Sequence, residues 1–168
     1  RSLAETERRS DAGHILTGEV LAGRHPVVLV FGARSDVGDS LCARLSALGL
    51  VTLCVSRTAG DVRATPRTVT VEPDLFLRNR RGAELDVVAV VSVCPIWELN
   101  RFEGFLSDIR RDNQPWVVLS STSVVTKSDS KRQEESGIAA KLQQGEAWVS
   151  THRNAVVGPT VIVRPTLI

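Results

Sequence analysis

Hydrophobic and polar positions alternate in blocks along the chain. Short apolar runs predict strands, and they lie at residues 27–31, 51–55, 69–71, 87–93, 116–119 and 160–163. Between several of these runs, apolar residues recur at helical spacing. Those stretches predict helices at residues 37–48, 97–111 and 136–150, with a short helix or loop at 76–84.

The alternation of strands and helices predicts an α/β fold, in which helices cover both faces of a parallel sheet. Right-handed crossovers then give a doubly wound sheet with strand order 3-2-1-4-5-6. The run at 87–93 lacks polar alternation, which predicts a central strand buried on both faces. The expected buried strand residues are Val28, Val30, Leu53, Val88, Val90, Val118 and Leu119.

The chain is long enough for one domain with a single hydrophobic core, which we expect at residues 27–168. Residues 1–26 mix basic and acidic side chains and predict an N-terminal extension outside that core. A docking arm for a partner is the alternative interpretation of this extension.

The first predicted strand and helix are joined by a glycine turn at residues 30–38, Val-Phe-Gly-Ala-Arg-Ser-Asp-Val-Gly. Turns that hold a pyrophosphate use one glycine to leave the strand, a second for backbone approach and a third for helix packing. Gly32 and Gly38 fill the first and third positions, and Ser35 stands near the second. Two interpretations stay open. The helix N-terminus binds a pyrophosphate, or Ser35 or Asp36 caps the same N–H groups.

The second predicted strand ends at Ser56 and Arg57, the place where dinucleotide folds meet the adenosine ribose. An acidic residue there would bind the 2′-hydroxyl of NAD, whereas an arginine suits the 2′-phosphate of NADP. No acid occurs between Thr52 and Ala59. NADP is therefore favoured over NAD if a dinucleotide binds. The alternative is that Arg57 is a solvated loop cation.

Composition narrows the classes of function. The net charge of +2 gives no argument for nucleic acid, and no run of apolar residues is long enough to span a membrane. The three cysteines are far apart in sequence, without metal-ligand or redox-pair spacing. They favour a reducing compartment, such as the cytoplasm or an organelle matrix or stroma, and they predict no metal site.

Four motifs together resemble the extended and atypical short-chain dehydrogenases of the NAD-dependent epimerase/dehydratase type. They are the turn at 30–38, Asp74-Leu75, Leu-Ser-Ser-Thr-Ser at 119–123 and Arg-Pro-Thr-Leu-Ile at 164–168. The resemblance covers about residues 27–168. It implies a dinucleotide-binding domain whose adenine contacts Asp74 and Leu75. The implied cofactor-binding set is Gly32, Arg34, Ser35, Gly38, Arg57, Asp74, Leu75, Ser92, Val93 and Ser120.

The resemblance also implies two catalytic positions. Thr122 matches the Ser/Thr that polarises the substrate oxygen, and Lys141 matches the lysine of the Tyr-x-x-x-Lys pair. However, Gly137 stands four residues before Lys141, and the chain contains no tyrosine at all. Lys127 is a substitute only if it is not a solvated loop residue. The blander interpretations are that Lys141 is a surface lysine and that the hydroxyls at 120–123 cap backbone groups.

Carbonyl chemistry needs a proton donor or acceptor beside the reacting carbon, and tyrosine supplies it in this family. Family members also continue past the Arg-Pro-Thr motif into a substrate lobe, which is missing here and would leave any pocket half open. Two functions remain. One is an NAD(P)-binding protein of the dehydrogenase/epimerase type without Tyr-dependent catalysis, a pseudoenzyme. The other is a structural subunit that keeps the fold as a scaffold for protein partners in a larger assembly.

Overall fold

The computed structural model describes Val20 and residues 25–56, 67–72, 85–109, 112–155 and 158–165. The predicted element at 76–84 and most of residues 1–26 lie outside the described residues. The described elements are β1 (Val27–Phe31), α2 (Asp36–Ala47), β2 (Val51–Val55), β3 (Thr68–Val71), β4 (Val87–Ser92), η3 (Ile96–Phe102), α4 (Glu103–Asp108), β5 (Trp116–Leu119), α5 (Ser123–Thr126), α6 (Gln133–Ala155) and β6 (Thr160–Val163).

The strands form one parallel sheet in the order β3-β2-β1-β4-β5-β6, which confirms the predicted doubly wound topology. In the centre of the sheet, Val30 of β1 lies between Cys54 of β2 and Val91 of β4. The chain runs outward from β1 to β3 on one side and from β4 to β6 on the other. The topological switch point therefore lies between β1 and β4, where open α/β sheets bind their ligands.

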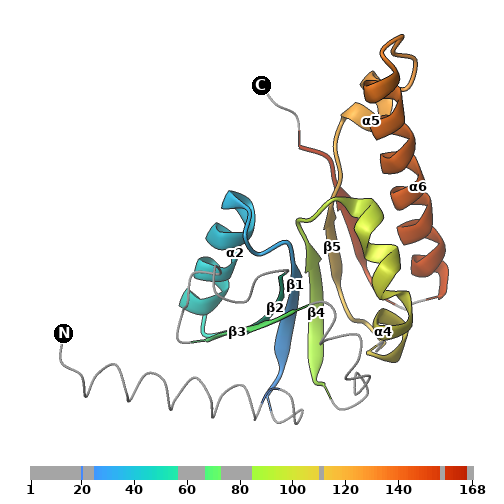
Figure 1. Cartoon of the computed structure of the whole chain (residues 1–168). Coiled ribbons are helices and arrows are strands. Elements are labelled where there is room, and N and C mark those ends of the chain that lie inside the picture. Colours follow the sequence, from blue (N-terminus) through green and yellow to red (C-terminus); the bar gives the residue numbers. More distant parts are fainter. Residues whose placement is uncertain are drawn as a thin grey trace.

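Helices pack on both faces of the sheet (Figure 1). Helix α2 lies on one face, and η3, α4 and α6 lie on the other. The larger core belongs to the second face, where alternate strand residues such as Leu29, Leu53 and Val90 pack against Leu99 and Leu106. The core under α2 is small and consists of Val28, Val30, Ala33, Cys42 and Cys54.

Two of the residues that we expected in the buried strands are not buried. Val88 is 41% exposed, because the pairing of β1 with β4 shifts by one residue there and leaves Val88 without a partner in β1. Leu119 is half-buried. It shares its sheet face with Val161 and Val163, which are 52% and 39% exposed, and the small core under α2 does not extend to β5 or β6. Because Val88 is exposed, the prediction that β4 is buried on both faces was wrong.

The helices also differ from the sequence prediction in detail. The segment predicted as one helix at 97–111 forms a 3-10 helix followed by the short α4. Ile96, Leu99 and Phe102 are its buried residues, and their spacing of three matches the 3-10 repeat. Helix α6 begins earlier than predicted, with acidic residues in its first turn that favour the N-terminal end of the helix dipole. Ile138, an apolar residue of this helix, is 49% exposed.

Val20 differs from the expectation that residues 1–26 stay outside the core. Its side chain is fully buried and belongs to the larger cluster on the η3, α4 and α6 face. Within the described part of the chain, no helix combines the length and the hydrophobicity that a membrane span requires.

Candidate functional site

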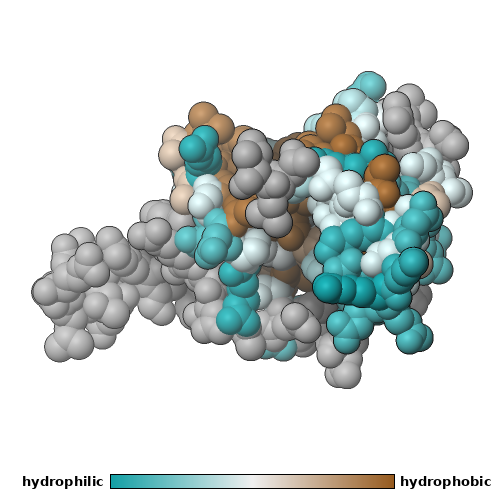
Figure 2. Space-filling model, turned by 90° about the horizontal axis from the view of Figure 1, so that it is seen from above, coloured by the Kyte–Doolittle hydropathy of each residue, from teal (hydrophilic) through white to brown (hydrophobic). Residues whose placement is uncertain are grey.

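A cleft of about 440 Å³ lies at the carboxyl ends of the central strands. It opens at the switch point between β1 and β4, with β2 beside it. In Figure 2, which views the molecule from above, hydrophobic side chains gather on the α2 side and toward the middle, and the opposite side is mostly hydrophilic. The cleft is lined by Phe31, Gly32, Arg34, Ser35, Val55, Ser56, Val93, Cys94, Pro95, Glu98, Arg101 and Phe102.

Gly32 and Gly38 meet the first and third glycine requirements of a dinucleotide turn. Gly32 has a φ of +81°, and a Cβ atom there would lie 2.6 Å from the backbone nitrogen of Cys94. A Cβ on Gly38 would overlap the carbonyl oxygen of Gly32. Both positions therefore exclude a side chain. The turn runs directly against the end of β4, and α2 packs directly on the turn.

Ser35 occupies the middle position of the turn and caps α2. Its Oγ accepts a hydrogen bond from the Gly38 N–H at 3.0 Å and donates one to the Gly32 carbonyl at 3.0 Å. One N–H group at the helix N-terminus is thus already occupied. Asp36 and Asp39 stand in the first turn, and their negative charges oppose the binding of a phosphate there.

The wall opposite α2 comes from the residues that follow β4. The thiol of Cys94 contacts the hydroxyl of Ser92 at 3.3 Å, and burial raises the pKa of that thiol. Farther out, Arg101 donates to Glu98 at 3.1 Å in an exposed ion pair on η3. We did not predict these η3 residues from the sequence. Their signal was present, because Pro95 ends a strand at the carboxyl edge and a helix begins immediately after it.

The cleft brings together part of the predicted cofactor-binding set. Gly32, Arg34, Ser35 and Val93 line it. The buried Gly38 lies directly beneath the turn, and Ser92 is buried at the end of β4. Arg57, Asp74 and Leu75 lie outside the described residues, so their contacts with a cofactor stay predictions.

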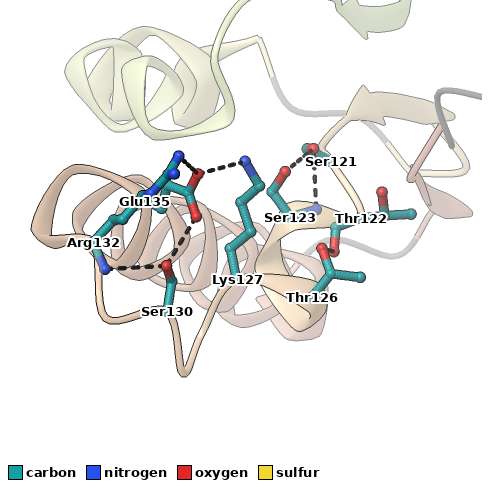
Figure 3. A network of polar contacts seen from close by, with 8 residues as sticks. All are labelled: Ser121, Thr122, Ser123, Thr126, Lys127, Ser130, Arg132 and Glu135. Atoms are coloured by element: carbon teal, nitrogen blue, oxygen red, sulfur yellow. Dashed lines mark hydrogen bonds and ion pairs between the residues drawn. The ribbon is translucent and has the colours of Figure 1, made fainter.

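A different arrangement follows β5, where the resemblance implies the catalytic groups (Figure 3). The Ser121 hydroxyl donates to the Ser123 hydroxyl at 3.1 Å, and the backbone N–H of Ser123 donates to the Ser121 hydroxyl oxygen. Lys127, whose side chain is 43% exposed, pairs with Glu135 at 3.3 Å, and the Ser130 hydroxyl donates to the same carboxylate at 2.8 Å. Together these donors lower the pKa of Glu135. The Ser121 hydroxyl is therefore directed at Ser123, and the Lys127 ammonium and the Ser130 hydroxyl are directed at the Glu135 carboxylate.

The two predicted catalytic residues lie on elements that follow β5. Thr122 is half-buried at the N-terminus of α5, and Figure 3 shows its side chain turned away from Lys127 and Glu135. Lys141 is exposed on α6, with its Nζ 6.0 Å from the centre of the Trp97 ring. Neither residue is among those that line the cleft.

The end of β6 is fixed to α6 by an ion pair. Arg164 donates through Nε to Oε1 of Glu146 at 2.8 Å and through Nη2 to Oε2 at 2.5 Å. Glu146 is buried, and Arg164, helped by the nearby Ser120 hydroxyl, lowers the pKa of its carboxyl. Of the predicted residues, Ser120 thus lies beside this ion pair rather than among those that line the cleft. Over the described ranges, no group of three or more metal-ligating side chains comes together.

No protein-family model matches the sequence, and neither does any curated protein. Solved structures do match. A short-chain dehydrogenase/reductase superfamily protein from Agrobacterium tumefaciens with bound NAD has a TM-score of 0.57 at 18% identity, over 82% of this chain and 48% of its own. UDP-glucose 4-epimerase from Thermotoga maritima has a TM-score of 0.61 at 10% identity, over 82% and 54%.

Vestitone reductase from alfalfa (Medicago sativa) has a TM-score of 0.63 at 14% identity, over 82% of this chain and 56% of its own. The chain thus spans about half the length of these three structures. At such identities the likeness concerns the arrangement of strands and helices. The chain has the Rossmann-like fold that these short-chain dehydrogenase and epimerase structures share.

Proposed function

We propose that this chain binds a nicotinamide adenine dinucleotide, NADP in preference to NAD, in the cleft between β1, β2 and β4, and that it does not catalyse Tyr-dependent carbonyl chemistry. The observation that carries the proposal is the turn at Gly32. Its φ is positive, and backbone atoms lie within 3 Å of the position that a Cβ would take, so there is no room for a side chain. This is the condition for a strand–turn–helix that approaches a pyrophosphate.

The residues present fit the adenosine and pyrophosphate half of a dinucleotide. Gly32, Arg34 and Ser35 would lie along the pyrophosphate, and Ser56 with the following Arg57 would meet the adenosine ribose. When bound, such a cofactor supplies a hydride to a partner carbon. This chain's own contribution is to bind and orient the cofactor. Phe31 and Phe102, whose ring centroids are 4.8 Å apart, form an apolar floor in the cleft.

The groups beyond β5 support a loss of catalysis. A general acid must have a proton to give at neutral pH, and a positioned one contributes roughly 10²–10⁴-fold to the rate. The chain has no tyrosine, and Lys127, the residue nearest to a substitute, is held by Glu135. The catalytic roles implied for Thr122 and Lys141 stay predictions, and neither residue lines the cleft in which we propose that the dinucleotide binds.

The alternative function is a scaffold for protein partners, with the dinucleotide site lost. The cap formed by Ser35 favours it, because the hydroxyl takes a helix N–H that a pyrophosphate would use, and Asp36 adds a negative charge beside it. Under this alternative the fold is kept and no dinucleotide binds.

Calorimetric titration of the chain with NADPH and NADH tests the proposal. We expect saturable 1:1 binding, with NADPH tighter than NADH, and we expect Arg57→Ala to narrow that difference. Arg67→Ala is the matched control, because Arg67 donates to the Gly49 carbonyl at the amino ends of β2 and β3, whereas the cleft lies at the carboxyl ends of the strands. The absence of saturation with either dinucleotide would contradict the proposal and support the scaffold. Equal affinities that do not change in Arg57→Ala would remove only the NADP preference.

Turnover is measured separately, with NADPH and a panel of aldehydes, ketones and nucleotide sugars. We expect none from the isolated chain. Turnover that persists in the wild type and disappears in Thr122→Ala would overturn the non-catalytic part of the proposal.

A further inference from the structure

Two cysteines that are distant in sequence meet in the small core beneath the cleft. Cys42 lies on the inner face of α2 and Cys54 in β2, and both are almost completely buried, at 1% and 0% exposed. Their sulfur atoms are 3.4 Å apart, in hydrogen-bond contact. The sequence spacing of twelve residues gave no sign of a redox pair, because the contact depends on how a helix packs on a neighbouring strand.

We propose that Cys42 and Cys54 form a redox pair, which a peroxide converts into a disulfide that joins α2 to β2. The proposal does not depend on dinucleotide binding. A disulfide needs a sulfur–sulfur distance of about 2.05 Å, so each sulfur must move by less than about 1 Å. A shift of that size is within the reach of small side-chain rotations, and the backbones of α2 and β2 are already packed together.

The place of each thiol in the fold decides which one attacks. Cys42 lies on α2, the helix whose local opening would admit peroxide, whereas Cys54 lies in β2 within the sheet. The thiolate is the reactive form, and the sulfur contact lets the Cys54 thiol donate a hydrogen bond to a Cys42 thiolate, so Cys42 is the attacking residue. Cys94 provides an internal comparison, since its thiol contacts the Ser92 hydroxyl and burial raises its pKa.

With hydrogen peroxide as the oxidant, the chemistry takes two steps. The Cys42 thiolate attacks one peroxide oxygen, the O–O bond breaks, and the released hydroxide takes a proton to become water, which leaves a sulfenic acid on Cys42. The Cys54 sulfur then attacks the Cys42 sulfur. The S–S bond forms, the S–O bond breaks, and the hydroxyl leaves as water with the Cys54 proton. Two thiols lose two electrons in total, and one peroxide becomes two waters.

Peroxide reaches the buried pair when α2 opens locally from the sheet. Such an opening is expected for a helix held by few buried contacts, and Gly38 and Cys42 are the buried residues of α2. Once formed, the disulfide closes a loop that contains the second half of α2, the turn at Gly49 and most of β2. It would tie α2, which follows the turn at Ser35, to β2, which is followed by Ser56. Ser35 and Ser56 both line the cleft.

The test uses Cys94→Ser as the background, so that only the proposed pair remains. The folded protein is treated with hydrogen peroxide, unfolded in the presence of a thiol alkylating agent and weighed by intact mass spectrometry. We expect a chain that is lighter by two hydrogen atoms and carries no alkyl group, with a reducible cross-link between the peptides that contain Cys42 and Cys54. Cys42→Ser and Cys54→Ser in the same background are the matched controls and should give no cross-link.

A second readout follows hydrogen exchange. In the oxidised form the α2 amides should exchange more slowly, by up to about tenfold, because the closed loop restricts local opening, whereas those of α6 should not change. The proposal is overturned if the folded protein keeps both thiols at a peroxide dose that links the urea-unfolded chain. It is also overturned if Cys42 is oxidised to the sulfinic acid without a link, or if wild type links Cys94 instead.

Discussion

The carboxyl edge of the sheet has two halves that differ in how their polar groups are used. At the β1–α2 half, backbone geometry prepares an open cleft, because Gly32 and Gly38 exclude side chains and the strand ends face the opening. At the β5–α5 half, the Ser121 hydroxyl donates to the Ser123 hydroxyl, and Lys127 pairs with Glu135. The first half keeps the features of a binding site, and the second has those of a structural cap.

Under the proposed function, this difference means that a Rossmann-like fold keeps its binding geometry without the groups that catalysis needs. The glycine turn serves both the fold and the ligand, since it allows α2 to pack on the sheet. A catalytic acid serves the reaction alone. Loss of such an acid leaves the sheet unchanged, whereas loss of a glycine at the turn disturbs both stability and binding.

The largest effect is expected for Gly32→Ala. The new residue must adopt a positive φ and its Cβ would overlap the Cys94 backbone, so we expect a loss of about 3 kcal/mol in the free energy of unfolding, together with at least tenfold weaker NADPH binding. Gly49→Ala is the control, because Gly49 also has a φ of +81° but no atom near its Cβ position. It should lose only about 1 kcal/mol. Similar losses from both substitutions in urea unfolding would refute the close approach at Gly32.

Substitutions of Ser35 separate its contribution to stability, as the cap of α2, from its effect on ligand binding. Ser35→Ala should cost about 1 kcal/mol and Ser35→Gly a few tenths, because glycine replaces a capping serine with little loss. Glycine also restores the backbone approach that a pyrophosphate needs, so Ser35→Gly should bind NADPH about three- to tenfold more tightly than Ser35→Ala. Thermal unfolding and calorimetry measure the two effects. An equal affinity in both variants would mean that Ser35 does not face the pyrophosphate.

The ion pair at the end of β6 should make stability depend on pH. Arg164 lowers the pKa of Glu146 in the folded protein, so the carboxylate contributes stability that is present above its unfolded pKa of about 4.3 and is lost as the pH falls through the folded value. Glu146→Gln should lower the melting temperature by on the order of 3 °C at pH 7.

That difference should disappear in acid, once the pH has fallen below the lowered pKa of Glu146 in the folded protein. Glu135→Gln is the matched control, because Glu135 has a lowered pKa in the same direction but is more exposed, and it should change the melting temperature less. A difference between Glu146→Gln and wild type that persists unchanged into acid would contradict this role of the carboxylate.

The smallest effects are expected from the two implied catalytic residues. Thr122→Val and Lys141→Ala should each change the NADPH dissociation constant by less than about twofold, or roughly 0.4 kcal/mol, because neither side chain lines the cleft. Calorimetry measures this directly. A tenfold loss in either variant would place the β5–α5 half in the binding site and remove the contrast between the two halves.

The sequence predicted the sheet order and most strands, because short apolar runs between glycine turns are a local signal. It also predicted the turn, since Gly32 and Gly38 stand at the two positions where a strand–turn–helix of this kind has no room for a side chain. It could not predict the exposure of Val88, which depends on a shift in the pairing of β1 with β4. The 3-10 helix at Ile96 was missed because a spacing of three at 96, 99 and 102 is also compatible with an α-helix.

For the site, the sequence indicated the residues of the turn but could not decide between pyrophosphate binding and capping. The structure shows the Ser35 side chain capping α2, and the titration with NADPH tests whether a pyrophosphate binds at the same turn. The η3 wall and the contact of Cys42 with Cys54 were missed for a common reason. Both result from packing between elements that are distant in sequence, and such packing cannot be predicted from the spacing of residues along the chain.

The measurement that tests the central claim most directly is a titration of isotopically labelled chain with NADPH, followed by the amide signals in nuclear magnetic resonance spectra. Binding at the β1–α2 half predicts saturable shifts at Gly32, Ser35, Ser56 and Cys94, with the signals of residues 121–127 nearly unchanged. No saturable shift, or shifts centred on residues 121–127, would contradict the account.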